Sequence, residues 1–131
     1  MASYIVLCMG SNQDGALHLQ QAHSLLLEAG LRLQWANSQV TQPIDCPCPN
    51  NFVNQVGGGY TDYDYPRLKQ KLKEIESQCG RRPEDKQAGI VKLDIDLLRF
   101  GDQYYKPDEW DRAYIKDGLK EIQASETENK R

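Results

Sequence analysis

Hydrophobic and polar residues follow two different periods along the first third of the chain. Tyr4–Cys8 is a continuous apolar run that stops at a turn-forming Met-Gly-Ser-Asn segment, which predicts a buried strand. Apolar residues then recur at helical spacing from Asp14, a candidate helix cap, to Gly30, which predicts a helix. Over residues 31–43 apolar and polar positions alternate as on a half-buried strand, until a proline ends the pattern.

The same kinds of pattern return in the next sixty residues. Phe52–Thr61 predicts a further strand, in which three consecutive glycines mark a bulge or the close approach of another segment. Pro66 suits the first turn of a helix whose apolar residues share one face as far as Gly80. Lys92–Gly101 is the last strand. This order predicts an α+β, ferredoxin-like βαββαβ sandwich, with an antiparallel sheet and helices on one face.

The end of the chain adds one more element to this fold. After Gly101 a polar loop leads into a short C-terminal helix with a few apolar residues available for packing. Residues 124–131 are polar, and we expect them to form a disordered tail. Because a chain of 131 residues with 39% hydrophobic content can bury one core, we expect a single domain over residues 1–123.

Charge and composition limit the classes of partner that the protein is expected to bind. The net charge is -3, and the 16 basic residues are scattered, which argues against a nucleic-acid surface but allows a small anionic ligand. The start has no basic leader, and no apolar run approaches the ~20 residues of a membrane span. We therefore expect a cytoplasmic protein. We also expect a monomer with small-molecule partners, although the sequence itself does not give the oligomeric state.

The four cysteines are irregularly spaced, which argues against a zinc site or a disulfide framework. Cys8 and Cys79 have the setting of small core residues. Cys46 and Cys48 lie in a proline-rich stretch that predicts a stiff loop with exposed thiols.

Two aspartates in the last strand raise the main chemical question. Asp94 and Asp96 are two positions apart, so their side chains project from the same face of the strand. Neighbouring buried carboxylates are unfavourable unless a cation or an open cleft accompanies them. Magnesium fits, because it prefers oxygen ligands and is often held by one or two carboxylates together with substrate phosphates. The alternative is that both aspartates lie on the solvent face of an edge strand, paired with Lys92 or Arg99.

Three segments together resemble a known enzyme family. They are YIVLCMGSN near the start, FVNQV in the middle, and EIESQCGR followed by KLDIDLLRFG, and the likeness spans residues 3–122. This order resembles hydroxymethyl-dihydropterin pyrophosphokinase of folate biosynthesis. The resemblance implies a ferredoxin-like fold, two Mg²⁺ ions, ATP as co-substrate, and transfer of pyrophosphate from ATP to the hydroxymethyl group of the pterin.

The resemblance also implies roles for individual residues. Asp94 and Asp96 would hold the metal ions and act in catalysis together with Arg81 and Arg112. The implied pterin-binding residues are Asn12, Thr41, Ile44, Phe52, Asn54 and Tyr114. The implied nucleotide-side residues are Glu76, Arg81 and Arg112. Stacking and a few directed hydrogen bonds suit a flat heterocycle, and cations suit phosphoryl transfer.

Taken without the resemblance, several of these residues have ordinary interpretations. Asn54 would be a strand residue that bonds its neighbours, and Phe52 and Tyr114 would be core aromatics. Glu76 and Arg112 would be exposed helix charges.

The sequence departs from the family pattern on the nucleotide side. Val91 stands where an arginine is expected, and the segment between Gly101 and Arg112 is short and lacks the proline-histidine stretch that closes over ATP. Candidate replacement cations are Lys86, Lys92 and Lys106. The leading hypothesis is a magnesium-dependent pyrophosphokinase. The alternatives are a weakened or inactive pterin-binding homologue and an unrelated ferredoxin-like interaction module.

Overall fold

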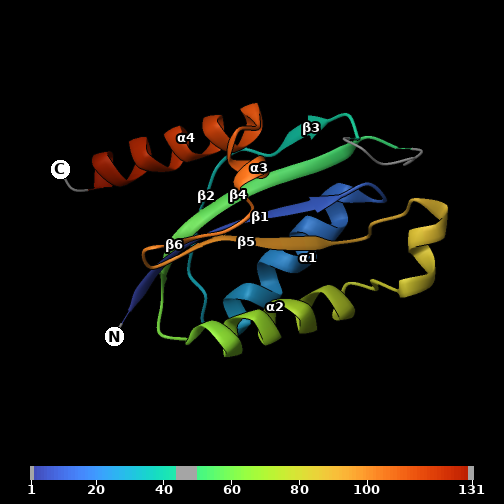
Figure 1. Cartoon of the computed structure of the whole chain (residues 1–131), viewed down its shortest axis with the longest axis horizontal. Helices are drawn as coiled ribbons and strands as arrows, with labels where there is room; N and C mark the ends of the chain where they lie inside the picture. Colours follow the sequence, from blue (N-terminus) through green and yellow to red (C-terminus); the bar gives the residue numbers. More distant parts are fainter. Residues whose placement is uncertain (1, 44–49, 130–131) are drawn as a thin grey trace.

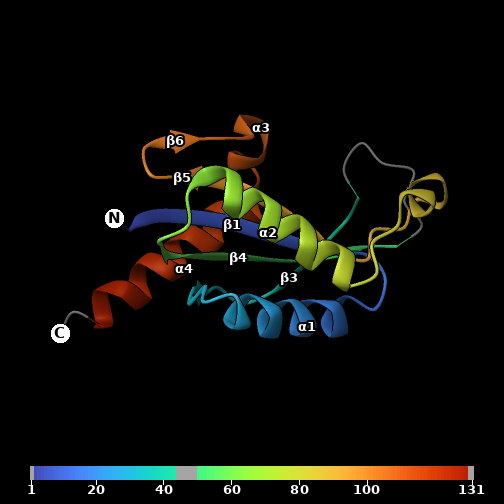
Figure 2. The ribbon, with the colours of Figure 1, turned by 90° about the horizontal axis from the view of Figure 1, so that it is seen from below.

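The computed structural model describes residues 2–43 and 50–129, with side chains described up to residue 125. The strands are β1 (Ser3–Ser11), β2 (Gln34–Trp35), β3 (Gln39–Thr41), β4 (Phe52–Thr61), β5 (Asp94–Phe100) and β6 (Gln103–Tyr104). The helices are α1 (Gly15–Glu28), α2 (Tyr65–Gln78), the 3₁₀ helix η1 (Pro83–Ala88), α3 (Pro107–Trp110) and α4 (Ala113–Asn129). Figures 1 and 2 show α1 and α2 on one face of the sheet and α4 on the other.

The sheet has β1 at its centre. Its order is β2-β4-β1-β5-β6, with β3 also paired to β4, and each pairing is antiparallel. This arrangement confirms the ferredoxin-like prediction. The strand expected over residues 31–43 is divided in two, since β2 and β3 pair separately with β4. Asn37 and Ser38 lie at the break, and both residue types favour turns over strands.

The core has a part on each face of the sheet. Under α1 and α2 the side chains of Leu93, Ile95 and Leu97 pack with apolar residues of β1 and both helices. On the other face Ile115 and Ile122 of α4 pack against β1, β4 and β5. The predicted sandwich with helices on one face therefore gains a cover on the second face, and this cover forms one wall of the site described below.

The C-terminal helix is longer than the sequence predicts. It continues to Asn129, through much of the stretch that we expected to form a tail. Alanine and glutamate in this stretch have high intrinsic helix propensity, so the helix continues beyond its last packed turn. The boundary of the single domain at residue 123 stays a prediction.

Two local predictions about helix starts have different outcomes. Pro66 lies in the first turn of α2, as expected, and the Asp64 side chain caps that helix by accepting from the Arg67 N–H at 2.9 Å. Asp14 does precede α1, but its backbone is left-handed, at φ 50°, and its side chain makes no capping bond. Asp14 therefore occupies the N-cap position, as predicted, but it does not cap the helix through its side chain.

The three glycines of β4 mark a close approach of neighbouring segments. A Cβ at Gly57 would lie 2.5 Å from the Trp35 ring, so the indole packs directly on the bare backbone. Cys8 and Cys79 are buried, which confirms them as core residues, whereas Cys46 and Cys48 lie outside the described residues. Within the described ranges no helix has both the length and the apolar content of a membrane span.

Candidate active site

A pocket opens on the α4 side of the sheet, where β1, β4 and β5 run side by side. Gly10 of β1 pairs with Asn54 of β4 on one side and with Asp94 of β5 on the other, and Cys8 pairs with Asp96. A Cβ at Gly10 would lie 2.9 Å from Asn54 Oδ1, so the amide needs a glycine beside it. The pocket is lined by Cys8, Gly10, Thr41, Gln42, Phe52, Asn54, Asp94, Asp96, Glu109, Arg112 and Tyr114.

One end of the pocket combines an amide, a hydroxyl and two aromatic rings. Asn54 is buried, and its Nδ2 donates a short hydrogen bond to Thr41 Oγ1. Thr41 reaches this position because β3 pairs with β4, with Thr41 opposite Phe52. Phe52 and Tyr114 are half-buried and line the same space. This end can hold a flat, polar ring by stacking and directed hydrogen bonds.

The other end of the pocket is acidic. Asp94 and Asp96 project from the same face of β5, opposite the core residues of that strand. Burial, followed by the negative charges of Asp94 and Glu109, raises the pKa of Asp96 to about 8. Simultaneous ionisation of the three carboxylates is therefore unfavourable when no cation is bound. A hard divalent cation would relieve this repulsion, and the two aspartates suit Mg²⁺, which is often held by one or two carboxylates together with substrate phosphates, although the described residues hold no group of three acidic, His or Cys side chains placed to bind a metal ion.

Glu109, Arg112 and Tyr114 form a hydrogen-bonded group at the wall of the pocket. Arg112 Nη1 donates to Tyr114 Oη at 3.1 Å and to Glu109 Oε1 at 3.3 Å. Burial would lower the pKa of Arg112, but the bond to Tyr114 and the charge of Glu109 raise it. Arg112 is thus a fixed cation that faces the acidic end of the pocket.

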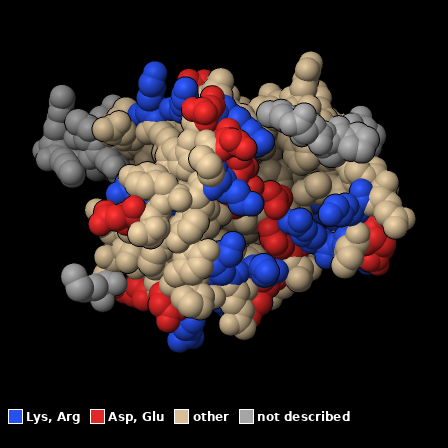
Figure 3. All heavy atoms as spheres, in the orientation of Figure 1, with Lys and Arg blue, Asp and Glu red and all other residues tan. Residues whose placement is uncertain are grey.

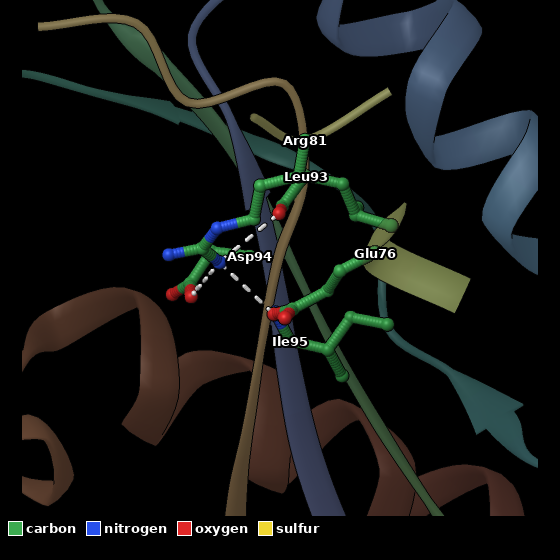
Figure 4. Close-up of polar contacts among 5 residues, drawn as sticks. All are labelled: Glu76, Arg81, Leu93, Asp94 and Ile95. Carbon is green, nitrogen blue, oxygen red and sulfur yellow. Dashed lines mark hydrogen bonds and ion pairs between the residues drawn. The ribbon is translucent and has the colours of Figure 1, made fainter. Parts of the chain in front are cut away.

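A second arginine holds the other side of the acidic end (Figure 4). Arg81 Nη1 donates to Asp94 Oδ1 at 2.8 Å, to Glu76 Oε2 at 3.1 Å and to the Leu93 carbonyl at 3.2 Å. Glu76 Oε2 also accepts from the Ile95 N–H at 2.7 Å. Burial raises the pKa of Glu76, while the Ile95 bond and Arg81 oppose that rise.

Arg81 also lines a basic pocket beyond this network. The pocket has a volume of about 640 Å³ and lies between the end of α2, η1 and the loop that leads to β5. Its lining residues include Lys73, Arg82 and Lys86, with Ile90 and Val91 as apolar contacts. Figure 3 shows Lys and Arg side chains on both sides of a central band of Asp and Glu on this face. The acidic band and the basic side chains therefore adjoin, and Arg81 joins them through its ion pairs with Asp94 and Glu76.

Comparison with known proteins identifies the family. The sequence model for 7,8-dihydro-6-hydroxymethylpterin-pyrophosphokinase (HPPK) matches residues 6–124. The chain belongs to the HPPK family. This confirms the resemblance drawn from the sequence segments, and it makes pyrophosphoryl transfer in folate biosynthesis the activity implied by membership. No curated protein matches the chain.

The structure brings most of the HPPK site residues implied by the resemblance into the first pocket, and two others border it. The residues in the pocket are Thr41, Phe52, Asn54, Asp94, Asp96, Arg112 and Tyr114. Glu76 and Arg81 line the basic pocket, and Arg81 reaches Asp94 from there. Ile44 lies outside the described residues. The roles of these residues remain predictions.

Asn12 does not line either pocket. It is buried, and its Nδ2 donates to the Gly89 carbonyl at 2.7 Å while its Oδ1 accepts from the Val91 N–H at 2.7 Å. These bonds attach the end of β1 to the loop before β5. The structure therefore gives Asn12 a scaffolding position next to the site, and its predicted contact with the pterin stays a prediction.

Sequence reasoning missed Glu109 as a site residue. It lies in α3, which has only four residues and so carries no periodic pattern. The spacing of Glu109 and Arg112 was the one available indication, because residues three apart on a helical turn can form an ion pair. Gln42 and Cys8 also line the pocket and were missed. Burial, followed by the charge of Asp96, raises the pKa of the Cys8 thiol far above its usual value.

The three candidate replacement lysines differ in what they can reach. Lys86 lines the basic pocket. Lys92 Nζ pairs with Asp85 at 3.2 Å, and Lys106 precedes α3 with a left-handed backbone at φ 55°. Neither lines one of the two pockets described here.

The alternative reading of Asp94 and Asp96 as surface residues paired with Lys92 or Arg99 is not supported. Asp94 pairs with Arg81, while the Arg99 guanidinium lies over the rings of Tyr4 and Tyr104.

Proposed function

We propose that this protein transfers a pyrophosphoryl group from ATP to 6-hydroxymethyl-7,8-dihydropterin, in a Mg²⁺-dependent step of folate biosynthesis. The observation that carries the proposal is that Asp94 and Asp96 share one pocket with Asn54, Phe52 and Tyr114. A phosphoryl-transfer centre and a site for a flat heterocycle are therefore adjacent. We also propose that the enzyme is a cytoplasmic monomer with small molecules as its substrates.

The pterin would occupy the uncharged end of the pocket. Its ring would stack on Phe52 and Tyr114, and the polar edge of the ring would bond Asn54 and Thr41. This orientation directs the hydroxymethyl group toward the aspartates. Because the hydrogen bond between Asn54 and Thr41 is already formed, binding of the ring would cost little conformational entropy for ordering these two side chains.

Magnesium would be held by Asp94 and Asp96, with the remaining ligands from water and nucleotide phosphates. Two ions are part of the proposal, because paired carboxylates can hold a pair of ions across a transferring group. When bound, Mg²⁺ neutralises the charge on the phosphoryl oxygens.

The nucleotide phosphates would extend toward the basic pocket. Arg81 borders that pocket from one side, Arg112 faces the acidic end from the other, and Arg82, Lys73 and Lys86 offer further positive charge. The pterin hydroxyl oxygen forms a bond to the β-phosphorus, the bond from that phosphorus to the α–β bridging oxygen breaks, and AMP leaves. The hydroxyl proton is released. The chain's own contribution is alignment and charge stabilisation, so a covalent intermediate is not required.

A coupled assay for AMP formation tests the proposal. We expect the wild-type protein to form AMP only when pterin, ATP and Mg²⁺ are all present. Asp96→Asn should lower turnover about a hundredfold or more, since it removes a charged group that holds the metal. Asp102→Asn is the matched control, because Asp102 is exposed in the turn after β5, and it should keep full turnover.

A second candidate is a pterin-binding homologue with weak or no catalysis. The observation that favours it is Val91, an apolar residue in the wall of the basic pocket, together with the pairing of Lys92 to Asp85. Both features reduce the positive charge available to the phosphates. Micromolar binding of the pterin without AMP formation at high Mg²⁺ would establish this candidate and exclude the enzyme.

A further inference from the structure

Glu76 lies at the junction between α2 and β5, and its carboxylate is already engaged. Its side chain is only 14% exposed, and a single oxygen, Oε2, accepts from both the Ile95 N–H and Arg81 Nη1. The main chain of the aspartate-bearing strand therefore fixes Glu76, and Glu76 in turn fixes Arg81. Glu76 lines the basic pocket, but it is mostly buried and its Oε2 is already shared by two donors, so it has little exposed surface for direct contact with a nucleotide.

Arg81 is held by one edge of its guanidinium. Within the described part of the chain, every hydrogen bond of this side chain uses Nη1, which meets Glu76, Asp94 and the Leu93 carbonyl. Figure 4 shows the other terminal guanidinium nitrogen on the side away from Glu76 and, in this view, next to the Asp94 carboxylate. The side chain is 43% exposed and lines the basic pocket, so part of it is accessible there.

We propose that Glu76 is a positioning residue, which acts on the nucleotide only through Arg81. It holds the guanidinium at the boundary of the acidic and basic pockets, with its accessible part presented to the phosphates. A cation that is fixed before the substrate arrives needs no reorganisation when charge develops. This inference rests on the proposed function, and it replaces the direct nucleotide contact that the sequence resemblance implies for Glu76.

Positioning and simple electrostatics predict opposite effects of the same substitution on nucleotide affinity. Glu76→Gln removes a negative charge near the phosphate site, so Coulomb repulsion alone predicts tighter binding of an anionic nucleotide. Positioning predicts weaker binding, because Arg81 loses its charge-assisted bond and its orientation. On an Arg81→Met background the positioning role is absent, so Glu76→Gln should then be neutral or favourable.

The experiment is a double-mutant cycle on nucleotide affinity. Calorimetry would measure binding of Mg²⁺ with an ATP analogue that has a methylene group between the α and β phosphates. The proteins are wild type, Glu76→Gln, Arg81→Met and the double variant. We expect Glu76→Gln to weaken binding about tenfold in wild type, the size of one charge-assisted hydrogen bond, and to cause no loss in the Arg81→Met background.

Two controls separate positioning from structural damage. Glu74→Gln makes the same change on the same helix at a side chain that is 48% exposed and paired with Lys71, and it should leave affinity unchanged. NMR of the Arg81 side-chain Nε–H, without any ligand, should give a sharp signal in wild type and a broadened one in Glu76→Gln.

Three results would overturn the inference. Equal losses in both backgrounds would mean that Glu76 touches the nucleotide itself, and tighter binding in Glu76→Gln would mean that only its charge matters. An Arg81 signal that is equally mobile with and without the Glu76 carboxylate would also exclude positioning, even if AMP is formed. Failure of wild type to bind the nucleotide and to form AMP would remove the proposed function together with this inference.

Discussion

At the scale of single residues, the carboxylates of the site differ in whether an arginine forms an ion pair with them. Asp94 pairs with Arg81, and Glu109 pairs with Arg112. Asp96 lies between them, and its pKa is raised by burial and by both neighbouring charges. In the metal-free protein the ionised form of Asp96 is therefore destabilised, and substitution of this residue should test the electrostatics of the whole pocket.

The first prediction at this scale concerns stability of the metal-free protein. Because the Asp96 pKa is raised from 3.8 to about 8, the folded state favours the protonated form, and stability falls as pH rises through this range. Asp96→Asn imitates the protonated form. Its melting temperature in EDTA should exceed that of wild type at pH 8.5, and the difference should shrink toward pH 4. A lower melting temperature at pH 8.5 would contradict this account.

The second residue-scale prediction separates two roles of Tyr114. Tyr114→Phe keeps the ring but removes the hydroxyl that accepts from Arg112. Under the proposed function, pterin affinity should stay within about twofold, while nucleotide affinity or turnover falls about fivefold, the size of one net hydrogen bond. Titrations with each substrate would measure this. Tyr60→Phe, at an exposed ring, is the control, and a loss confined to the pterin would contradict the prediction.

At the scale of elements, the sequence predicts what periodicity encodes and misses what only tertiary contacts create. Asp94 and Asp96 had to share a face, opposite Leu93 and Leu97, because strand residues alternate. The break between β2 and β3 is set by how each pairs with β4, and no local pattern fixes its place. Glu109 reaches the pocket through a four-residue helix, which is too short to be recognised from periodicity.

The contact between Gly57 of β4 and Trp35 of β2 gives a prediction for packing. Gly57→Ala would place a methyl group about 2.5 Å from the Trp35 ring, so the indole or the strand must move. We expect a loss of about 1–3 kcal/mol in the free energy of unfolding, measured in urea. Trp35→Leu makes room, and the two changes together should cost less than their sum. Strict additivity would show that the indole is not the obstacle.

At the scale of the whole molecule, the pocket collects residues from both halves of the chain. Cys8 and Gly10 come from the first strand, Asn54 from the middle and Tyr114 from the last helix. The fold class could be predicted because the order of elements admits few arrangements. The second cover of the sheet could not, since the polar composition after Gly101 gives no sign of where α4 packs.

The central place of β1 also bears on how the protein is made. This strand leaves the ribosome before β4 and β5, which complete its two hydrogen-bonding edges and follow much later in the sequence. During synthesis the nascent chain must therefore carry an apolar strand whose partners do not yet exist, a state that chaperones protect from aggregation.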